Sequence, residues 1–195
     1  ALRVSPTKVR RKSEMPSIYG FGDIDEEKLY NNVMTKWKWG NFDKMKLFVD
    51  KSYMAEVQAM KLVMMRAAIE FDNKGDKKKA AEMANKYFEA FPNMNFPYDS
   101  GIMPFISVLI KSKDFESAKK HLRILADETV QYIKFYESQT DQEVFDSFSS
   151  DYQYRISAAS DIVKNASEVE DPAFAKEMET MMAPYLKNTQ PSDKK

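Results

Sequence analysis

The feature that most constrains the fold is a pair of helical stripes between Tyr53 and Pro92. Apolar side chains that recur at steps of three and four lie on one face of a helix, and the first stripe consists of Tyr53, Val57, Met60, Met64, Ala67 and Phe71. Gly75 and the candidate N-cap Asp76 then interrupt the pattern. The second stripe is Ala80, Ala84, Tyr87 and Phe91, and Pro92 ends it. Since neither helix can bury its stripe alone, we predict an antiparallel pair that packs on further helical hairpins.

Composition narrows the class of protein. The 195 residues suit one domain with a sizeable core. The formal net charge is zero, so nothing global attracts a polyanion, and we expect no nucleic-acid partner. The chain has no cysteine, which excludes disulfides, thiol nucleophiles and thiolate metal sites. No apolar run approaches the roughly 18–20 residues that span a bilayer, so we expect a soluble piece.

The chain begins at Ala1 with a basic stretch, without an initiator methionine or a signal-like apolar region. We expect either an excised fragment or a processed product. Residues 1–24 carry five basic side chains and several prolines and glycines, which predicts an irregular basic arm. Such an arm is either solvated or attracted to an anionic partner or lipid surface.

Further helices are expected on both sides of the central pair. Asp25-Glu26-Glu27 favours the start of a short helix that ends near Gly40. The apolar stretch from Ile102 to Ile110 predicts a helix surrounded by others, with Pro104 in its first turn. The longest stripe is Phe115, Ala118, Leu122, Leu125, Thr129, Tyr132 and Tyr136.

A third hairpin is expected from Thr140 onward. Its first face is Phe145, Phe148, Tyr152, Ile156, Ala159 and Val163, and its second is Phe174, Met178, Met181 and Tyr185. Asp171-Pro172 is a favourable helix start, whereas Pro184 is expected to kink or end the last helix. We therefore predict an all-α domain over residues 25–187, with about six main helices, followed by a polar tail at residues 188–195.

A repeat relates the first two hairpins. Ala80 and Ala118 occupy equivalent positions 38 residues apart, a spacing typical of helical solenoids. The first hairpin resembles a tetratricopeptide repeat (TPR) at Ala68, Phe71, Gly75, Ala80 and Pro92, but departs from it at Ala84 and Tyr87. The second keeps Ala118 and has Lys113 and Val130 in place of glycine and proline. We predict a TPR-like α-α superhelix with degenerate repeats, in which Ala80 and Ala118 mark close helix crossings.

Three segments carry a more particular resemblance: Leu29 to Gly40, Lys77 to Asp99 and Ile102-Met103-Pro104. The first contains Tyr-Asn-Asn-Val-Met and Lys-Trp-Lys-Trp-Gly, and the second ends in Phe-Pro-Tyr-Asp. Between Ala1 and Tyr152 the chain resembles the C-terminal region of a bacterial family of multi-pass membrane proteins. That family is grouped with the protein O-mannosyltransferase-like (GT-C type) glycosyltransferases.

The resemblance implies a longer parent protein. Its N-terminal membrane part would hold the lipid-linked sugar donor and the catalytic carboxylates, and the helical region would lie on the extracytoplasmic, periplasmic face of the inner membrane. No catalytic position of the family has a counterpart here, so none is assigned, and no cofactor or metal site is expected.

The aromatic side chains of Trp37, Trp39 and Phe42 form the candidate binding surface. Aromatic faces stack on sugars and peptides, although packing of this segment onto the first hairpin is the simpler interpretation. Because indoles two residues apart cannot share a helical face, one of them is expected to be exposed or to pack across the following loop.

Other candidates are interpreted structurally. Pro97, Tyr98, Asp99 and Pro104 are expected to form a structural joint between hairpins, with Asp99 capping the next helix. His121, the only histidine, is expected at a surface or an interface. The acidic group Asp23, Asp25, Glu26 and Glu27 lacks the spacing of a calcium loop and is interpreted as helix-start charge.

The function expected from the sequence is that of a non-catalytic accessory domain of a membrane glycosyltransferase-like protein, which scaffolds or binds a protein or glycan acceptor. The alternative is a free-standing helical-repeat module that binds protein or carbohydrate. The membrane would be reached only through segments of the parent protein.

Overall fold

The computed structural model describes residues 24–186, and this part of the chain is all-α. Within it lie α1 (Glu26–Thr35), α2 (Met54–Asn73), α3 (Lys77–Ala90), α4 (Met103–Lys111), α5 (Phe115–Glu137), α6 (Gln142–Ser147), α7 (Ser149–Ser167) and α8 (Pro172–Leu186). Short 3-10 turns at Lys51–Tyr53 and Ser100–Ile102 precede α2 and α4. Residues 24–186 contain no strand, and no helix among them is long and apolar enough to cross a membrane. The predicted basic arm, apart from Ile24, and the predicted polar tail lie outside the described residues.

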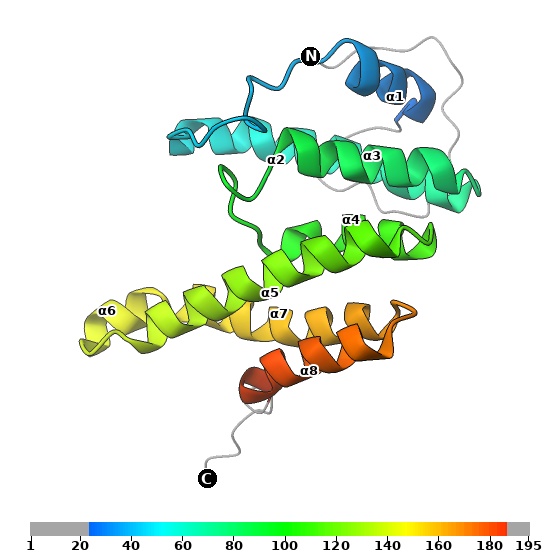
Figure 1. The fold of residues 1–195 in the computed structure, drawn as a ribbon. Coiled ribbons are helices and arrows are strands. Elements are labelled where there is room, and N and C mark those ends of the chain that lie inside the picture. The colour runs from blue at the N-terminus through cyan, green and yellow to red at the C-terminus, as the bar shows by residue number, and fades with distance from the viewer. Residues whose placement is uncertain (1–23, 187–195) are drawn as a thin grey trace.

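Six of the helices form three pairs that are consecutive in the chain: α2 with α3, α4 with α5, and α7 with α8. Figure 1 shows these pairs stacked as layers, with α1 beyond the first pair and α6 at the far end of α5. Contacts between α2 and α4 and between α5 and α7 join successive layers. The predicted all-α class is confirmed by this arrangement.

The turns inside the first two pairs are built alike. Gly75 and Lys113 both adopt a left-handed backbone, with φ of 82° and 61°, which ends the preceding helix. Asp76 and Asp114 follow, and each carboxylate accepts a hydrogen bond from the N–H three residues on, at 3.1 and 3.3 Å. The 38-residue period therefore corresponds to a repeated turn geometry.

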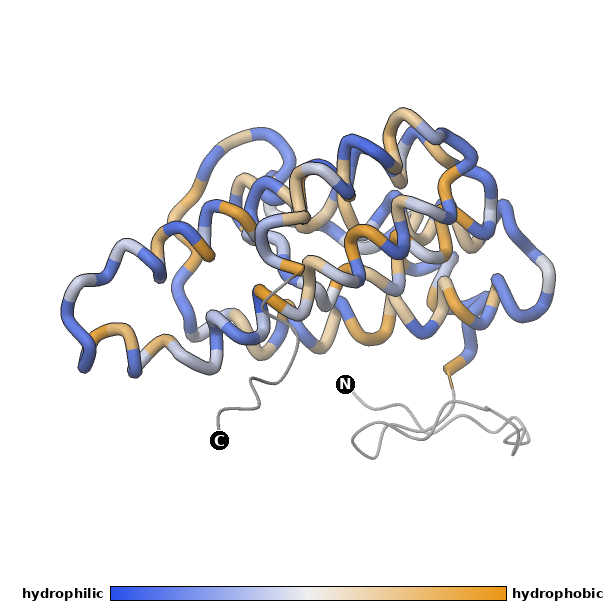
Figure 2. Tube along the Cα trace, turned by 90° about the horizontal axis from the view of Figure 1, so that it is seen from below, coloured by the Kyte–Doolittle hydropathy of each residue, from blue (hydrophilic) through white to orange (hydrophobic). Residues whose placement is uncertain are grey.

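One face of each main helix is buried in a continuous core. Hydrophobic and hydrophilic residues alternate along the Cα trace of the helices, as expected for helices that each bury one side (Figure 2). The largest side chains without exposure include Phe71, Phe105, Phe174, Met64 and Met83. The predicted long helix is confirmed as α5, whose 23 residues bury Ala118, Leu122, Leu125, Thr129 and Tyr136.

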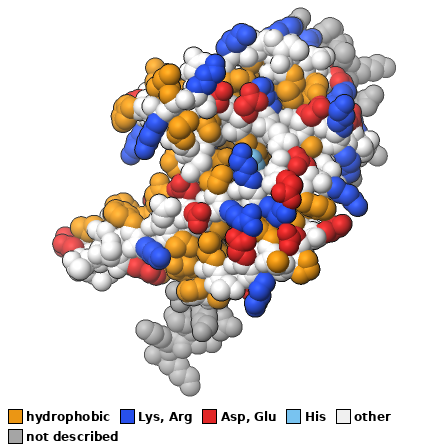
Figure 3. Space-filling view, viewed as in Figure 1, with side chains coloured by type: hydrophobic (Ala, Val, Ile, Leu, Met, Phe, Trp, Pro, Cys, Tyr) orange, Lys and Arg blue, Asp and Glu red, His pale blue; other side chains and the backbone are white. Residues whose placement is uncertain are grey.

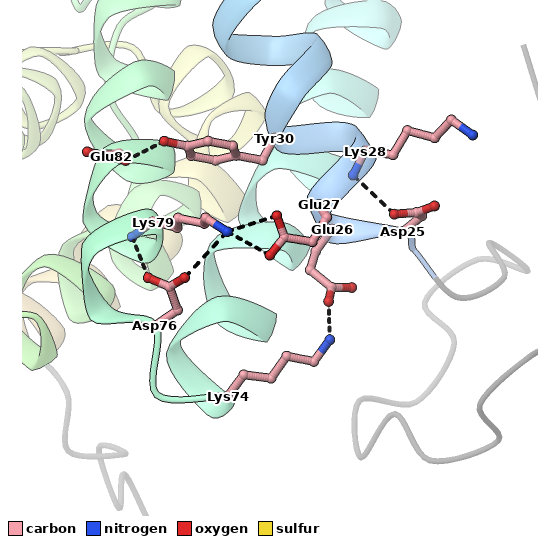
Figure 4. Close-up of polar contacts among 9 residues, drawn as sticks. All are labelled: Asp25, Glu26, Glu27, Lys28, Tyr30, Lys74, Asp76, Lys79 and Glu82. Atoms are coloured by element: carbon pink, nitrogen blue, oxygen red, sulfur yellow. Dashed lines mark hydrogen bonds and ion pairs between the residues drawn. The ribbon is translucent and has the colours of Figure 1, made fainter.

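Helix α1 is attached to the first pair mainly at its polar surface. Figure 4 shows three contacts that tie it to α2 and α3: Glu26 with Lys74, Glu27 with Lys79, and the Tyr30 hydroxyl with Glu82. Burial and the bond to the Glu82 carboxylate raise the pKa of Tyr30 to about 12. Val33 is the one buried residue of α1. Since exposed ion pairs contribute about 0–1 kcal/mol each, α1 is held less firmly than the paired helices.

Two stripe assignments are wrong at the start of α2. Tyr53 and Met60 were expected on the buried face, yet they are 61% and 37% exposed. The reason is length: α2 has 20 residues and α3 has 14. The first turns of α2 therefore extend past the end of α3 and have no partner helix there.

Helix boundaries differ from the sequence expectation at two further points. Helix α1 ends at Thr35, before the indoles, although the sequence predicted a helix that ends near Gly40. The first helix of the third hairpin is divided at Phe148 into α6 and α7. Pro184 lies inside α8, which continues to Leu186, the last residue that the structure describes.

Candidate functional site

A groove with a volume of about 600 Å³ opens where α2 extends past α3. It is lined almost entirely by apolar and aromatic side chains, and we call it the aromatic groove. Its lining is Trp37, Lys38, Trp39, Gly40, Phe42, Leu47, Phe48, Val49, Tyr53, Glu56, Val57, Met60 and Phe91. All three side chains of the predicted candidate surface, Trp37, Trp39 and Phe42, are among these residues.

The aromatic wall is assembled by edge-to-face ring contacts. The Trp37 and Trp39 rings lie 5.5 Å apart, and Trp39 lies 5.5 Å from Phe91 at the end of α3. Phe42 packs on Phe96 at 4.9 Å. The two indoles contact each other and both are half-buried, because the chain has left the helix at Thr35 and the helical spacing rule no longer applies.

A buried asparagine fixes the outer wall of the groove. The Asn95 side chain is 7% exposed and bonds three backbone groups of the segment between α1 and α2. Its Nδ2 donates to the carbonyls of Phe42 and Met45, at 2.7 and 2.9 Å, and its Oδ1 accepts from the N–H of Leu47 at 2.6 Å. These bonds hold a segment without regular secondary structure in a defined path.

The groove offers little charge. Lys38 and Glu56 are the charged residues in its lining. The indole Nε1–H of Trp39 is buried and has no hydrogen-bond partner among residues 24–186. A buried unpaired donor destabilises a fold by about 1–3 kcal/mol, so the position of this ring is not explained by stability alone.

The rim of the groove is apolar and exposed. Phe48 is 92% exposed, Tyr53 61% and Leu47 37%. Figure 3 shows hydrophobic and basic side chains gathered side by side at the end of the molecule where α2 begins. Contiguous exposed apolar surface of this kind marks interaction sites in folded proteins.

The segment predicted to be a structural joint is held on several sides. Asp99 accepts from the N–H of Gly101 at 2.9 Å and lies 3.6 Å from the Lys61 ammonium group of α2. Tyr98 is 3% exposed, and its carbonyl accepts from Arg155 of α7 at 2.8 Å. Pro104 lies in the first turn of α4, while Pro97 is exposed. Packing within the fold accounts for these side chains, and the absence of a ligand role for the segment stays a prediction.

Of the two positions expected for His121, the surface is wrong, because this residue is buried between α5 and α3. It is 6% exposed, its ring stacks on Phe88 with centroids 3.6 Å apart, and its Nδ1 lies 3.1 Å from the Tyr98 hydroxyl. Burial, together with the positive charge of Lys120, lowers the pKa of His121 to about 4. The sequence pattern could not show this, because the residues that cover the ring, Phe88 and Tyr98, lie before α4 in the chain, outside the hairpin that contains His121.

The remaining candidates lie outside the groove. Ala80 and Ala118 are fully buried, one on α3 and one on α5, each four residues after its capping aspartate. Asp25 caps α1, and Glu26 and Glu27 pair with lysines, whereas Asp23 lies outside the described residues. Within residues 24–186, no three histidine or acidic side chains cluster as a metal site would require.

Several groove residues were not singled out from the sequence. Leu47, Phe48 and Val49 lie between the predicted short helix, which was expected to end near Gly40, and the stripe that begins at Tyr53. The signal was present: three consecutive large apolar residues in a stretch without helical periodicity are unusual for a solvated loop.

Comparison with protein-family models, with curated proteins and with solved structures finds no match for this chain. The family resemblance described above therefore stays a prediction.

Proposed function

We propose that this domain is a non-catalytic interaction module that binds an apolar segment of a polypeptide partner in the aromatic groove. The observation that carries the proposal is the groove itself, an apolar cavity formed by Trp37, Trp39 and Phe42 against the unpaired start of α2. Binding sites are typically concave, apolar and of this size, with a few polar groups that set orientation.

A polypeptide fits this lining better than a glycan. Sugars need several converging hydrogen-bond partners in addition to an aromatic face, and Lys38 and Glu56 are the charged groups that the lining provides. Apolar side chains of a peptide need only the aromatic wall.

The non-catalytic assignment is supported by the chemistry that the chain lacks. It has no cysteine and one histidine. That histidine is stacked in the core, away from the groove. Histidine, the side chain used most often as a general base, and cysteine, one of the common nucleophiles, are thus not available at the proposed site.

We further propose that the three hairpins form a TPR-like superhelix, and that the domain is the accessory part of a membrane glycosyltransferase-like protein on the periplasmic face of the inner membrane. The repeated turns at Gly75 and Lys113 support the first part. The resemblance of Leu29 to Gly40 and of Phe-Pro-Tyr-Asp supports the second. A multi-span hydrophobic region encoded directly upstream of Ala1 is expected, and an upstream sequence without one would remove the membrane assignment.

The binding proposal is tested with a phage-displayed peptide library panned against the domain. We expect selected peptides rich in large apolar residues, and their affinity is measured by fluorescence anisotropy. The variant Met60→Gln removes an apolar contact inside the groove and should weaken binding about tenfold.

The matched control is Met94→Gln, because Met94 is exposed to a similar extent, 41% against 37%, and does not line the groove. It should leave affinity unchanged. Equal affinities for the two variants would refute the groove as the binding site. If the domain instead binds a glycan on an array, and Met60→Gln loses that binding, the ligand of the groove is a sugar and not a peptide.

A further inference from the structure

The most exposed large hydrophobic side chain among residues 24–186 lies at the rim of the groove and points away from the core. Phe48 is 92% exposed, and Met45, three residues before it, is 54% exposed. Both belong to the segment Asp43–Lys51, which runs from the groove wall to the start of α2. We call this segment the apolar-basic loop.

The exposure of Phe48 is built into the backbone. Asn95 binds the backbone at Phe42, Met45 and Leu47 from the inner side. At the other end, the Asp50 carboxylate accepts from the N–H of Ser52 at 2.8 Å. The backbone is therefore held on both sides of Phe48, and along this path the Phe48 ring is exposed.

The apolar-basic loop and the residues next to it carry a net positive charge. Residues 36–53 carry five lysines and two aspartates, a net charge of +3 in a chain whose total is zero. The lysines are Lys36, Lys38, Lys44, Lys46 and Lys51, and all are exposed. None of the five forms an ion pair with another residue of 24–186, whereas nine other lysines in this range do.

We infer that the apolar-basic loop docks the domain onto the surface of an anionic lipid bilayer, with Phe48 and Met45 entering the headgroup boundary and the lysines contacting lipid phosphates. An exposed aromatic ring beside unpaired lysines matches the two attractions that hold peripheral proteins at such surfaces. Aromatic side chains also favour the membrane–water interface. A nucleic acid would need a row of free stacking rings along a basic groove. Here the rings of Trp37, Trp39 and Phe42 are packed against other aromatic rings, and only the rings of Phe48 and Tyr53 are exposed among residues 36–53.

The test is co-sedimentation of the domain with vesicles. Vesicles of phosphatidylcholine with about 30 mol% phosphatidylglycerol should bind the domain about tenfold or more tightly than vesicles of phosphatidylcholine alone. Binding to the anionic vesicles should fall steeply at about 0.5 M NaCl, where the Debye length is only a few ångströms. Equal binding to both vesicle types, or binding to neither, would overturn the inference.

Paired variants locate the contact. Phe48→Ser should weaken vesicle binding about tenfold, and its control is Phe135→Ser, which removes a ring that is 51% exposed on α5. The double variant Lys44→Gln, Lys46→Gln should weaken binding to a similar degree, and its control neutralises the exposed Lys120 and Lys164. Controls that lose binding as strongly as the loop variants would contradict docking through this loop.

This inference does not rest on the peptide site. Met60→Gln, which is expected to lose peptide affinity, should keep vesicle binding, and the Lys44, Lys46 variant should keep peptide binding. The two proposals can therefore fail separately.

Discussion

Acidification is expected to destabilise the domain through His121 by an amount that can be worked out. Burial lowers its pKa from the usual 6.5 to about 4, so the folded state keeps the ring neutral while the unfolded state becomes protonated. The stabilising contribution is fully present above pH 6.5 and is lost as the pH falls from there toward 4. Integrated over that interval, the loss is about 3 kcal/mol at pH 4.

Because carboxylates also titrate in this interval, the contribution of His121 must be isolated with a variant. His121→Phe retains a ring to stack on Phe88 and cannot be protonated, although it leaves the Tyr98 hydroxyl unpaired. The unpaired hydroxyl lowers the stability of the variant by an amount that does not change with pH. The free energy of unfolding is measured by urea denaturation of both proteins at pH 7, 6, 5 and about 4.

The wild-type protein should lose about 3 kcal/mol more than His121→Phe between pH 7 and 4. Since the chain has a single histidine, its ring protons can also be followed directly by NMR. Parallel pH profiles for the two proteins, or a ring titration near pH 6.5, would refute a buried, neutral His121.

Four further substitutions test the packing and the turns. Ala118→Leu should overpack a fully buried site on α5 and cost about 1–3 kcal/mol; an unchanged melting midpoint would contradict the burial. Asp99→Ala should lower the free energy of unfolding, measured by urea denaturation, by about 0.5–2 kcal/mol, because the Gly101 N–H loses its cap. Its peptide affinity should stay the same. A variant that keeps its stability but loses peptide affinity would instead place the binding site in the joint. Lys113→Gly should raise stability by about 0.5–1 kcal/mol, because glycine adopts the left-handed backbone without the strain that a side chain causes there. Gly75→Ala should lower stability by about 1 kcal/mol for the same reason. A loss of stability in Lys113→Gly together with a gain in Gly75→Ala would refute the equivalence of the two turns.

The helices themselves could be predicted because their causes are local. The caps at Asp76, Asp99 and Asp171 and the period of α5 each depend on a few neighbouring residues, so the pattern identifies them directly. The ends of the helices were harder to predict from the sequence. Nothing local distinguishes Thr35 from Trp37 as the end of α1, since the chain leaves the helix to pack its indoles on Phe91, 52 residues away from Trp39.

The candidate site could be predicted only in part, for the same reason. Trp37, Trp39 and Phe42 were found because clustered aromatics are conspicuous in a sequence. Their partners across the groove, such as Met60, were assigned to the core. Periodicity cannot show that α2 extends past the end of α3 by more than a turn. The role of Asn95 could not be predicted either, because its bonds to Phe42, Met45 and Leu47 connect residues about 50 positions apart.

The two tryptophans make the most direct measurement possible, because both of them line the groove and the chain contains no others. A ¹H–¹⁵N spectrum of the labelled domain shows their two indole N–H signals separately from the backbone amides, and it is recorded during titration with a peptide selected by panning. If the groove is the binding site, both indole signals shift and saturate with the measured affinity, while amides of α8 stay in place. Saturating shifts elsewhere in the domain, with both indole signals unchanged, would contradict binding in the aromatic groove.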